Sequence, residues 1–311
     1  MELKNKKILV TGGSGFLGKA LIPLLNAEGA DTIIFKRSEY DLRNESNVKR
    51  LFDDTRPDIV IHAAVHGGGI GHMKQHPGSI YYDNIMMNSL MVEYSRLYKV
   101  EKFVGIGTVC SYPKFSPVPF KEEDLWNGYP EETNAPYGLT KKMMLVQQRS
   151  YEIEYGLRSN HLLLVNMYGP HDDFDPSTSH VIPALLMKFE KAKREGLPEV
   201  VCWGTGKPTR EFLYVEDGAR AIVLATKKCT TSAPINVGSE YEISIKDLST
   251  LIAKLFGYKE KIVWDTTKPD GQPKRRLDIT KAKKEFGFTA GTSFETGLKN
   301  TIEWYLNRAK Q

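Results

Sequence analysis

A glycine-rich segment near the start of the chain constrains the fold more than any other feature. It reads Thr11-Gly12-Gly13-Ser14-Gly15-Phe16-Leu17-Gly18, directly after an apolar run at 7–11 that predicts a buried strand. Gly12 permits a tight turn, Gly15 lets a pyrophosphate approach the backbone, and Gly18 allows close packing. At the start of the next helix, unpaired backbone N–H groups and the positive end of the helix dipole favour a bound anion. The segment therefore predicts a dinucleotide-phosphate site, which Phe16 and Leu17 also border.

Strand and helix patterns alternate through the first half of the chain. Apolar runs typical of strands buried on both faces lie at 7–11, 32–35, 58–62, 103–107 and 161–165. Amphipathic stretches such as 18–28 and 85–98 predict helices between them. This repeat implies right-handed crossovers, and hence an α/β fold with a Rossmann-type doubly wound parallel sheet.

The second half predicts a smaller C-terminal substrate-binding lobe. A helix is expected at 181–195, a strand at 199–203 and a last helix at 293–308. We assign 1–165 to the dinucleotide-binding domain, with 212–238 returning to it. The smaller lobe then comprises 166–211 and 239–311.

Composition and charge argue against several classes of protein. The formal net charge of +5 suits an anionic small molecule and falls well short of a nucleic-acid-binding stripe. Three cysteines without a CxxC pair argue against a disulfide framework or a structural zinc site. The start of the chain lacks a signal-peptide pattern, and no apolar run approaches the roughly 18 residues of a membrane span. We expect a soluble, cytoplasmic protein that binds neither nucleic acid nor membrane.

The residues after the second strand predict which dinucleotide binds. Lys36 and Arg37 stand where an NAD enzyme would carry an acid for the ribose hydroxyls. Arg37 is the better candidate for a 2′-phosphate because its planar fork can bind phosphate through two N–H groups. The pattern favours NADP (NADPH). Two solvated surface charges at a strand end are the alternative.

A catalytic pattern lies at Tyr137-Gly138-Leu139-Thr140-Lys141. Four residues apart on a helix, Tyr137 and Lys141 share a face, so the ammonium favours the phenolate and reaches the nicotinamide ribose, while Lys142 points elsewhere. Bringing a phenol from a pKa of about 10 toward neutrality requires about 4 kcal/mol, within reach of a buried cation plus the cofactor's ring charge. Tyr137 would protonate a carbonyl oxygen that Thr108 hydrogen-bonds while hydride arrives at carbon.

The GxxGxxG spacing of the glycine segment resembles the extended short-chain dehydrogenase/reductase superfamily. This resemblance implies that Asp41 and Leu42 edge the adenine pocket and that Ala63 and Ala64 line the cofactor site. A narrower resemblance, to the GDP-L-fucose synthase family, covers nearly the whole chain. It is carried by GTVCSYPK at 107–114, EETNAPY at 131–137, NMYGPHDDF at 166–174, SHVIPAL at 179–185, WGTGKPTREFL at 203–213 and KPDGQPKR at 268–275.

The narrower resemblance implies epimerisation of GDP-4-keto-6-deoxy-D-mannose at C3 and C5, followed by NADPH-dependent reduction at C4. One carbonyl serves both steps, because the C4 ketone acidifies the protons on its two neighbouring carbons. By the same resemblance Cys110 is the base and His180 the acid on the opposite face of the sugar. A thiol near pKa 8.5 and an imidazole near 6.5 bracket neutral pH. From the residues alone, a buried apolar cysteine and a hydrogen-bonding histidine at a helix start remain alternatives.

The family resemblance also places the nucleotide half of the substrate on the second lobe. Trp203 and Arg210 fall at the guanosine diphosphate, Lys188 stands where the family usually has a cation, and Asn166 lies near the sugar. Aromatic stacking and arginine pairing suit a base and a diphosphate. The alternative for Arg210 is an ion pair with Glu211 at a lobe junction.

Departures from the family pattern leave the sugar open. Val109 and Ser111 differ from the residues expected beside the cysteine, and the loop at 63–72 is longer and richer in histidine. A 6-deoxy-heptose or another nucleotide-linked keto sugar is therefore an alternative substrate. His66, His72 and His76 lack a matched carboxylate or thiolate cluster, so no metal is expected.

Three other functions stay open. They are a simple C4 reductase, a sugar-nucleotide 4-epimerase or dehydratase that recycles NAD, and a cofactor-sensing regulatory protein without catalysis. The joint presence of Thr108, Tyr137 and Lys141 argues against the last. By analogy with the superfamily we expect a homodimer through the helices near 85–98 and 137–155.

Overall fold

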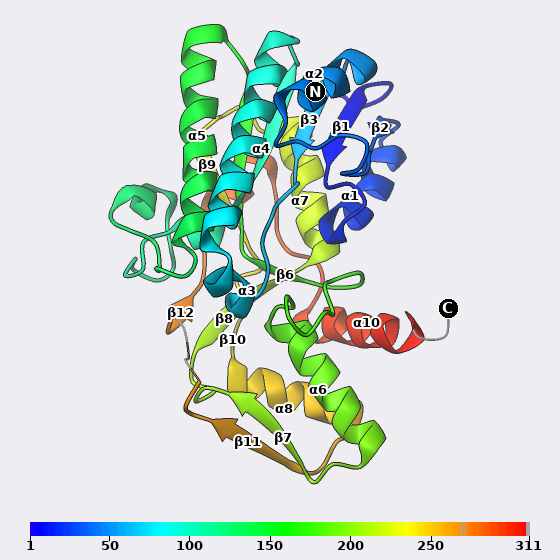
Figure 1. Cartoon of the computed structure of the whole chain (residues 1–311), viewed down its shortest axis with the longest axis vertical. Coiled ribbons are helices and arrows are strands. Elements are labelled where there is room, and N and C mark those ends of the chain that lie inside the picture. Colours follow the sequence, from blue (N-terminus) through cyan, green and yellow to red (C-terminus); the bar gives the residue numbers. More distant parts are fainter. Residues whose placement is uncertain (269, 271, 309–311) are drawn as a thin grey trace.

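A six-stranded parallel sheet organises the larger lobe of the computed structural model, which describes residues 1–268, 270 and 272–308 (Figure 1). The strand order is β2-β1-β3-β4-β5-β9. The strands are β1 (Lys7–Thr11), β2 (Asp31–Ile33), β3 (Ile59–His62), β4 (Lys102–Thr108), β5 (Ser159–Leu164) and β9 (Pro234–Val237). The predicted α/β fold with a Rossmann-type doubly wound sheet is confirmed.

Helices cover both faces of this sheet, because successive side chains of each strand point to opposite sides. Ile8 and Val10 pack into the core shared with α1 and α7, whereas Leu9 packs with α2 and α4. On one face α1 packs against α7, and on the other α4 lies beside α5 (Figure 1). The helices of this lobe are α1 (Phe16–Ala27), α2 (Glu45–Thr55), α3 (Ile70–Gln75), α4 (Pro77–Leu97), α5 (Ala135–Tyr155), α7 (Val215–Lys228) and α9 (Thr280–Phe286).

The smaller lobe has its own core, centred on Phe189, Phe212 and Phe294. Strand β8 pairs with β6, β10 and β12, and β7 pairs with β11. The strands are β6 (Asn166–Tyr168), β7 (Glu199–Trp203), β8 (Thr209–Tyr214), β10 (Glu242–Ser244), β11 (Lys261–Asp265) and β12 (Lys274–Arg275). The helices are α6 (Val181–Glu195), α8 (Ile245–Phe256) and α10 (Phe294–Asn307), and two 3₁₀ turns, η1 (Val109–Ser111) and η2 (Glu122–Trp126), lie earlier in the chain.

Several elements differ in extent from the sequence prediction. Strand β2 ends at Ile33, because Ile34 leaves the sheet and lies against Gly13 of the glycine turn. Helix α4 starts eight residues earlier than expected, at Pro77, a residue well suited to a first helical position. The segment 212–238 is divided: the end of β8 pairs within the smaller lobe, whereas α7 packs on the main sheet and β9 completes it.

Candidate functional site

The cofactor end of the site lies where the strand order reverses, between the carboxyl ends of β1 and β3. Gly12 has φ +71°, and a Cβ on it would lie 3.1 Å from the backbone of Ala64. A Cβ on Gly18 would lie 2.3 Å from the Gly13 carbonyl oxygen. The amide of Ala64 donates to the Thr11 hydroxyl at 3.0 Å. Added side chains would collide with the backbone, so the turn packs tightly against Ala64 and the start of α1, where the helix N–H groups suit a phosphate.

Basic and acidic side chains flank the loop after β2. Arg37 is exposed in this loop, whose Ile34 touches the glycine turn. Asp41 accepts hydrogen bonds from Arg43, with Nη2 to Oδ2 at 2.6 Å, and this arginine, aided by Arg37, lowers the Asp41 pKa to about 2. Leu42 is buried in the core beneath the loop. Arg37 is therefore an exposed cation on the loop that contacts the glycine turn, which suits the binding of a 2′-phosphate.

Tyr137 and Lys141 lie on the inner side of α5. The Lys141 Nζ is 6.0 Å from the centre of the Tyr137 ring, and the lysine is almost fully buried. Burial lowers the pKa of Lys141 to about 7. Burial also raises the pKa of the Tyr137 phenol, with Cys110 adding to the rise and the Thr108 hydroxyl opposing it. In the protein alone the phenol pKa is thus raised, opposite to the shift toward neutrality that the sequence analysis expects from Lys141 together with the cofactor.

Lys142 is separate from this pair, as the sequence predicts. Its Nζ donates to the Leu125 carbonyl at 2.7 Å and lies over the Trp126 ring. The difference between the two adjacent lysines follows from helix geometry, since neighbours in a helix project about 100° apart.

Cys110 sits in the 3₁₀ turn η1 that follows β4. The turn is closed by the Thr108 hydroxyl, which accepts from the Cys110 amide at 3.2 Å, and by Ser111 Oγ, which donates to the Gly138 carbonyl at 3.0 Å. A Cβ on Gly138 would lie 2.3 Å from the Cys110 carbonyl oxygen, so α5 and η1 are in tight contact. This packing brings the thiol into the surroundings of the Tyr137 phenol.

His180 is the N-cap residue of α6, in the smaller lobe. Its side chain is accessible, and the surrounding protein lowers its pKa while Asp173 opposes that shift. Two residues earlier, the Thr178 carbonyl accepts from the Gly69 amide at 2.6 Å, so the histidine-rich loop is attached to this segment. Within the described part of the chain, no hydrogen bond joins His180 to Cys110 or Tyr137.

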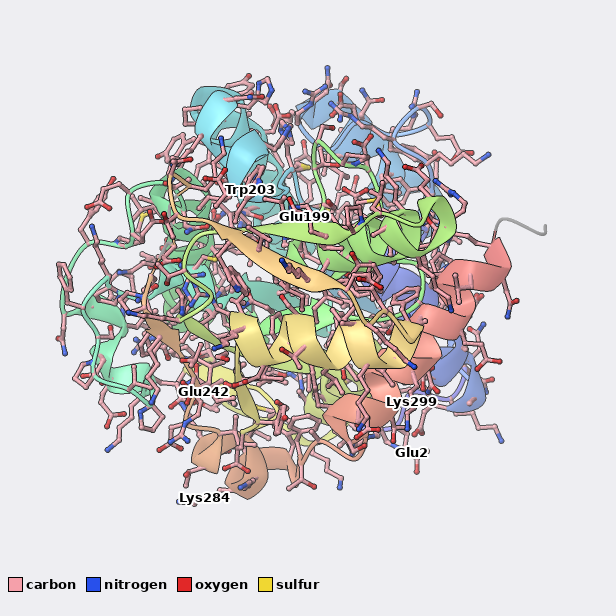
Figure 2. The ribbon with its side chains drawn as sticks, turned by 90° about the horizontal axis from the view of Figure 1, so that it is seen from below. Glu2, Glu199, Trp203, Glu242, Lys284 and Lys299 are labelled. Carbon is pink, nitrogen blue, oxygen red and sulfur yellow. The ribbon has the colours of Figure 1, made fainter. Side chains whose placement is uncertain are left out.

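Trp203 and Lys188 come together on the smaller lobe. The Trp203 indole is exposed at the end of β7 (Figure 2), and the Nζ atoms of Lys188 and Lys268 lie 5.3 and 5.7 Å from its ring centre. Lys188 Nζ also donates to the Val201 carbonyl at 2.8 Å, and burial lowers the Lys188 pKa. An exposed aromatic face beside two ammonium groups can bind a base next to phosphate.

Arg210 does not pair with Glu211 in the structure. The Glu211 carboxylate instead accepts from the amides of Ser239, Glu240 and Leu277. Arg210 Nη1 donates to its neighbouring Thr209 carbonyl at 2.7 Å, and burial lowers the Arg210 pKa to about 10. The register of β6 on β8 sets Asn166 opposite Phe212, two residues along from Arg210.

A buried polar chain behind the site was not predicted. The Thr11 hydroxyl contacts His62 Nδ1 at 2.8 Å, His62 Nε2 contacts Asn88 Oδ1 at 3.0 Å, and Asn88 Nδ2 donates to the Thr140 carbonyl at 3.2 Å. Burial lowers the His62 pKa to about 3, so the ring is neutral. The chain connects the glycine turn to the helix of Tyr137. The sequence offered one sign of this polar chain, because His62 is a polar residue at the end of an apolar strand.

The described residues contain no cluster of three or more His, Cys, Asp or Glu side chains suited to a metal ion. Over the same residues, no helix is long and apolar enough to cross a membrane. Pro269 and Gly271, in the segment 268–275 that carries part of the family resemblance, lie outside the described residues.

The parallel sheet, the glycine turn at its switch point and the Thr108–Tyr137–Lys141 set define an extended short-chain dehydrogenase/reductase. The chain belongs to the NAD dependent epimerase/dehydratase family, which matches residues 8–238. Within that class it belongs to the GDP-L-fucose synthase family. It is 36% identical to GDP-L-fucose synthase 1 of Arabidopsis thaliana, over 98% of this chain and 95% of that protein. The resemblance found in the sequence is thereby confirmed.

Other relatives agree in sequence and in fold. GDP-L-fucose synthase of Escherichia coli K12 is 35% identical, over 98% of both chains. A GDP-L-fucose synthetase from Naegleria fowleri, solved with NADP, is 30% identical with a TM-score of 0.89, over 99% of this chain and 96% of that one. A GDP-6-OMe-4-keto-L-xylo-heptose reductase from C. jejuni is 28% identical with a TM-score of 0.90, over 98% of both chains.

Proposed function

We propose that this protein is an NADPH-dependent enzyme that epimerises a GDP-linked 4-keto-6-deoxy sugar at C3 and C5 and then reduces it at C4. The observation that carries the proposal is the placement of Cys110 directly beyond Thr108, with its thiol beside the Tyr137 phenol. A proton-transfer group for a neighbouring carbon and the acid for the ketone thus lie close together.

The cofactor is NADP(H), and the chain offers it a fitted site. The cradle formed by Gly12, Gly15 and the start of α1 suits the pyrophosphate, and Arg37 suits the 2′-phosphate. Ala63 and Ala64 line the base of this cradle. When bound, NADPH supplies the hydride for reduction.

The reduction step uses three side chains of the larger lobe. Tyr137 gives its proton to the C4 oxygen, and the Thr108 hydroxyl hydrogen-bonds the same oxygen. Lys141, with a pKa near neutrality, becomes charged at little cost when an oxyanion forms beside it. The ammonium then favours the deprotonated phenol that this step leaves behind.

The epimerisation step uses one group from each side of the sugar. Cys110 removes a proton from a carbon beside the ketone, and His180 on the smaller lobe delivers a proton to the other face. The ketone oxygen, bound by Thr108 and Tyr137, carries the negative charge of the enolate. Both steps therefore rely on one polarised carbonyl.

The nucleotide binds along the smaller lobe. Trp203 stacks on guanine, Lys188 and Arg210 pair with the diphosphate, and Asn166 lies near the sugar. This assignment is supported by the exposed Trp203 indole, which ammonium groups flank, and by the half-buried guanidinium of Arg210.

Deuterium uptake tests the proposal. A GDP-4-keto-6-deoxy sugar is incubated with the enzyme in deuterated water without NADPH, so that the ketone is not reduced, and the sugar is analysed by mass spectrometry. Wild type should incorporate deuterium at two carbons, and Cys110→Ser should not, while still reducing a substrate that already has the epimerised configuration. His180→Gln should exchange but fail to complete inversion. Undiminished uptake by Cys110→Ser would remove the epimerase activity from the proposal.

A simple C4 reductase of a GDP-linked heptose is the second candidate. It is favoured by the histidine-rich loop that contacts Thr178 and by the departures at Val109 and Ser111. A panel of GDP-linked 4-keto sugars, followed by NADPH absorbance, separates the two candidates. Reduction without deuterium uptake would support the reductase.

We further propose a cytoplasmic homodimer formed through α4 and α5. These helices lie side by side and carry exposed apolar residues, among them Tyr82 and Ile153, which is 85% exposed. Three free cysteines fit a reducing compartment.

A further inference from the structure

Arg275 lies against the candidate base Cys110, although the two residues are far apart in sequence. Its Nη1 is 3.5 Å from Cys110 Sγ, within hydrogen-bond distance for sulfur. Its Nε donates to Gln272 Oε1 at 2.7 Å, and Gln272 Nε2 donates to the Lys114 carbonyl at 2.8 Å. Arg275 is only 8% exposed. The guanidinium is thus fixed in orientation by a backbone-anchored amide.

A second guanidinium faces the same thiol. Arg210 is the register partner of Arg275, because β12 runs parallel to β8. The Arg210 pKa is lowered by burial and by Arg275, and Cys110 opposes that fall. The titratable and charged groups around Sγ are Tyr137 on α5, Arg210 on β8 and Arg275 on β12, with Asp270, before β12, acting on Arg210.

Within the described residues, neither the buried Arg275 nor the half-buried Arg210 has a carboxylate at ion-pair distance. Asp270 acts on Arg210 from farther away and raises the Arg210 pKa. A buried cation without an opposite charge is costly, and its cost falls when a nearby group becomes an anion. Arg275 donates a hydrogen bond to Cys110 Sγ, and this thiol is a group that can become an anion.

We propose that Arg275 is a positioning residue for Cys110, which holds the sulfur by an N–H···S contact and stabilises it as the thiolate. Its role rests on the proposed function, in which Cys110 is the base for epimerisation. The guanidinium suits this role better than an ammonium would, because its planar fork donates to Gln272 and to the sulfur at once. Arg210 remains available for the diphosphate.

The pH dependence of Cys110 alkylation tests the contact directly, because the thiolate is the reactive form. The cofactor-bound enzyme without sugar is treated with iodoacetamide from pH 5.5 to 9.5, and labelling of the peptide containing Cys110 is quantified by mass spectrometry. Cys110→Ser provides the background from Cys202 and Cys229. Arg275→Met should slow labelling about tenfold at pH 7, because the sulfur loses its N–H donor and the adjacent cation. Arg275→Lys should recover part of the loss.

Two further variants keep the test decisive. Lys274→Met removes the adjacent exposed cation of the same strand and should leave the labelling profile as in wild type. Gln272→Leu releases Arg275 Nε without removing the guanidinium, and should slow labelling about threefold at pH 7. If Arg275→Met does not fold, the labelling profile of Gln272→Leu tests the same contact.

Kinetics separate this role from direct substrate binding. Arg275→Met should lower the rate of deuterium uptake at saturating sugar more than it raises KM. An unchanged labelling profile, together with a raised KM for the GDP-sugar, would overturn the proposal and assign Arg275 to the diphosphate. Because labelling is measured without sugar, its result stands even if Cys110→Ser retains deuterium uptake and the epimerase proposal fails.

Discussion

The buried ammonium of Lys141 should make the stability of the cofactor-free protein depend on pH in a specific way. A fall of the Lys141 pKa from 10.5 to about 7 on folding corresponds to about 5 kcal/mol of lost stability at pH values below both pKa values. Between these two values the unfolded chain binds more protons than the folded one. Stability contributed at this site therefore rises with pH across the window from about 7 to 10.5.

The perturbation is Lys141→Met, which keeps an unbranched side chain in the same space without the charge. The free energy of unfolding by urea is measured for the cofactor-free wild type and variant at pH 7, 8 and 9. We expect the variant to be the more stable at pH 7, and the difference to shrink by about 2 kcal/mol between pH 7 and pH 9. Groups that titrate equally in both proteins cancel in this difference.

Lys142→Met is the matched control, since Lys142 is adjacent and buried, but its Nζ donates to the Leu125 carbonyl. This control should retain most of the wild-type pH dependence. Parallel pH curves for wild type and Lys141→Met would refute the reasoning, because they would mean that Lys141 is charged in the folded protein throughout the range.

Three other variants test the remaining assignments. Arg37→Ala should weaken NADPH binding tenfold or more while changing NADH binding less than threefold, since only NADPH carries the 2′-phosphate; equal effects in fluorescence titrations would contradict the assignment. Tyr137→Phe should reduce turnover more than a hundredfold in an NADPH absorbance assay with cofactor affinity nearly unchanged, and a variant with a tenth of wild-type turnover would exclude Tyr137 as the acid. Ile153→Asp should convert a dimer to a monomer in light scattering, with Tyr82→Asp as a second probe of the same surface; a wild-type monomer would dismiss the interface.

The sequence predicted most of the larger lobe because the signals there are local. An apolar run followed by a glycine turn defines both a buried strand and the start of the helix after it, and β1 has the expected bounds. Strand β2 was predicted to end two residues too late, since Ile34 and Phe35 continue its apolar pattern. The contact of Ile34 with Gly13, which ends the strand, is between residues from different elements.

The sequence also predicted the Tyr137–Lys141 pair, because the two residues are four residues apart, and residues at this spacing share one face of an α-helix. The family blocks supplied Cys110 and His180, whose mutual placement is still a prediction. The low pKa of Lys141 was not predicted, since it depends on how deeply α5 packs against the sheet.

The sequence by itself determined the class of fold, the dinucleotide turn and the residue types of the active site, because each of these depends on neighbours along the chain. Tertiary structure decided which distant residues share a pocket. The contact of Arg275 with Cys110 depends on the pairing of β12 with β8, and the polar chain through His62 and Asn88 depends on the packing of α4 against α5. Interactions across long loops leave no periodic pattern, so only the folded chain reveals them.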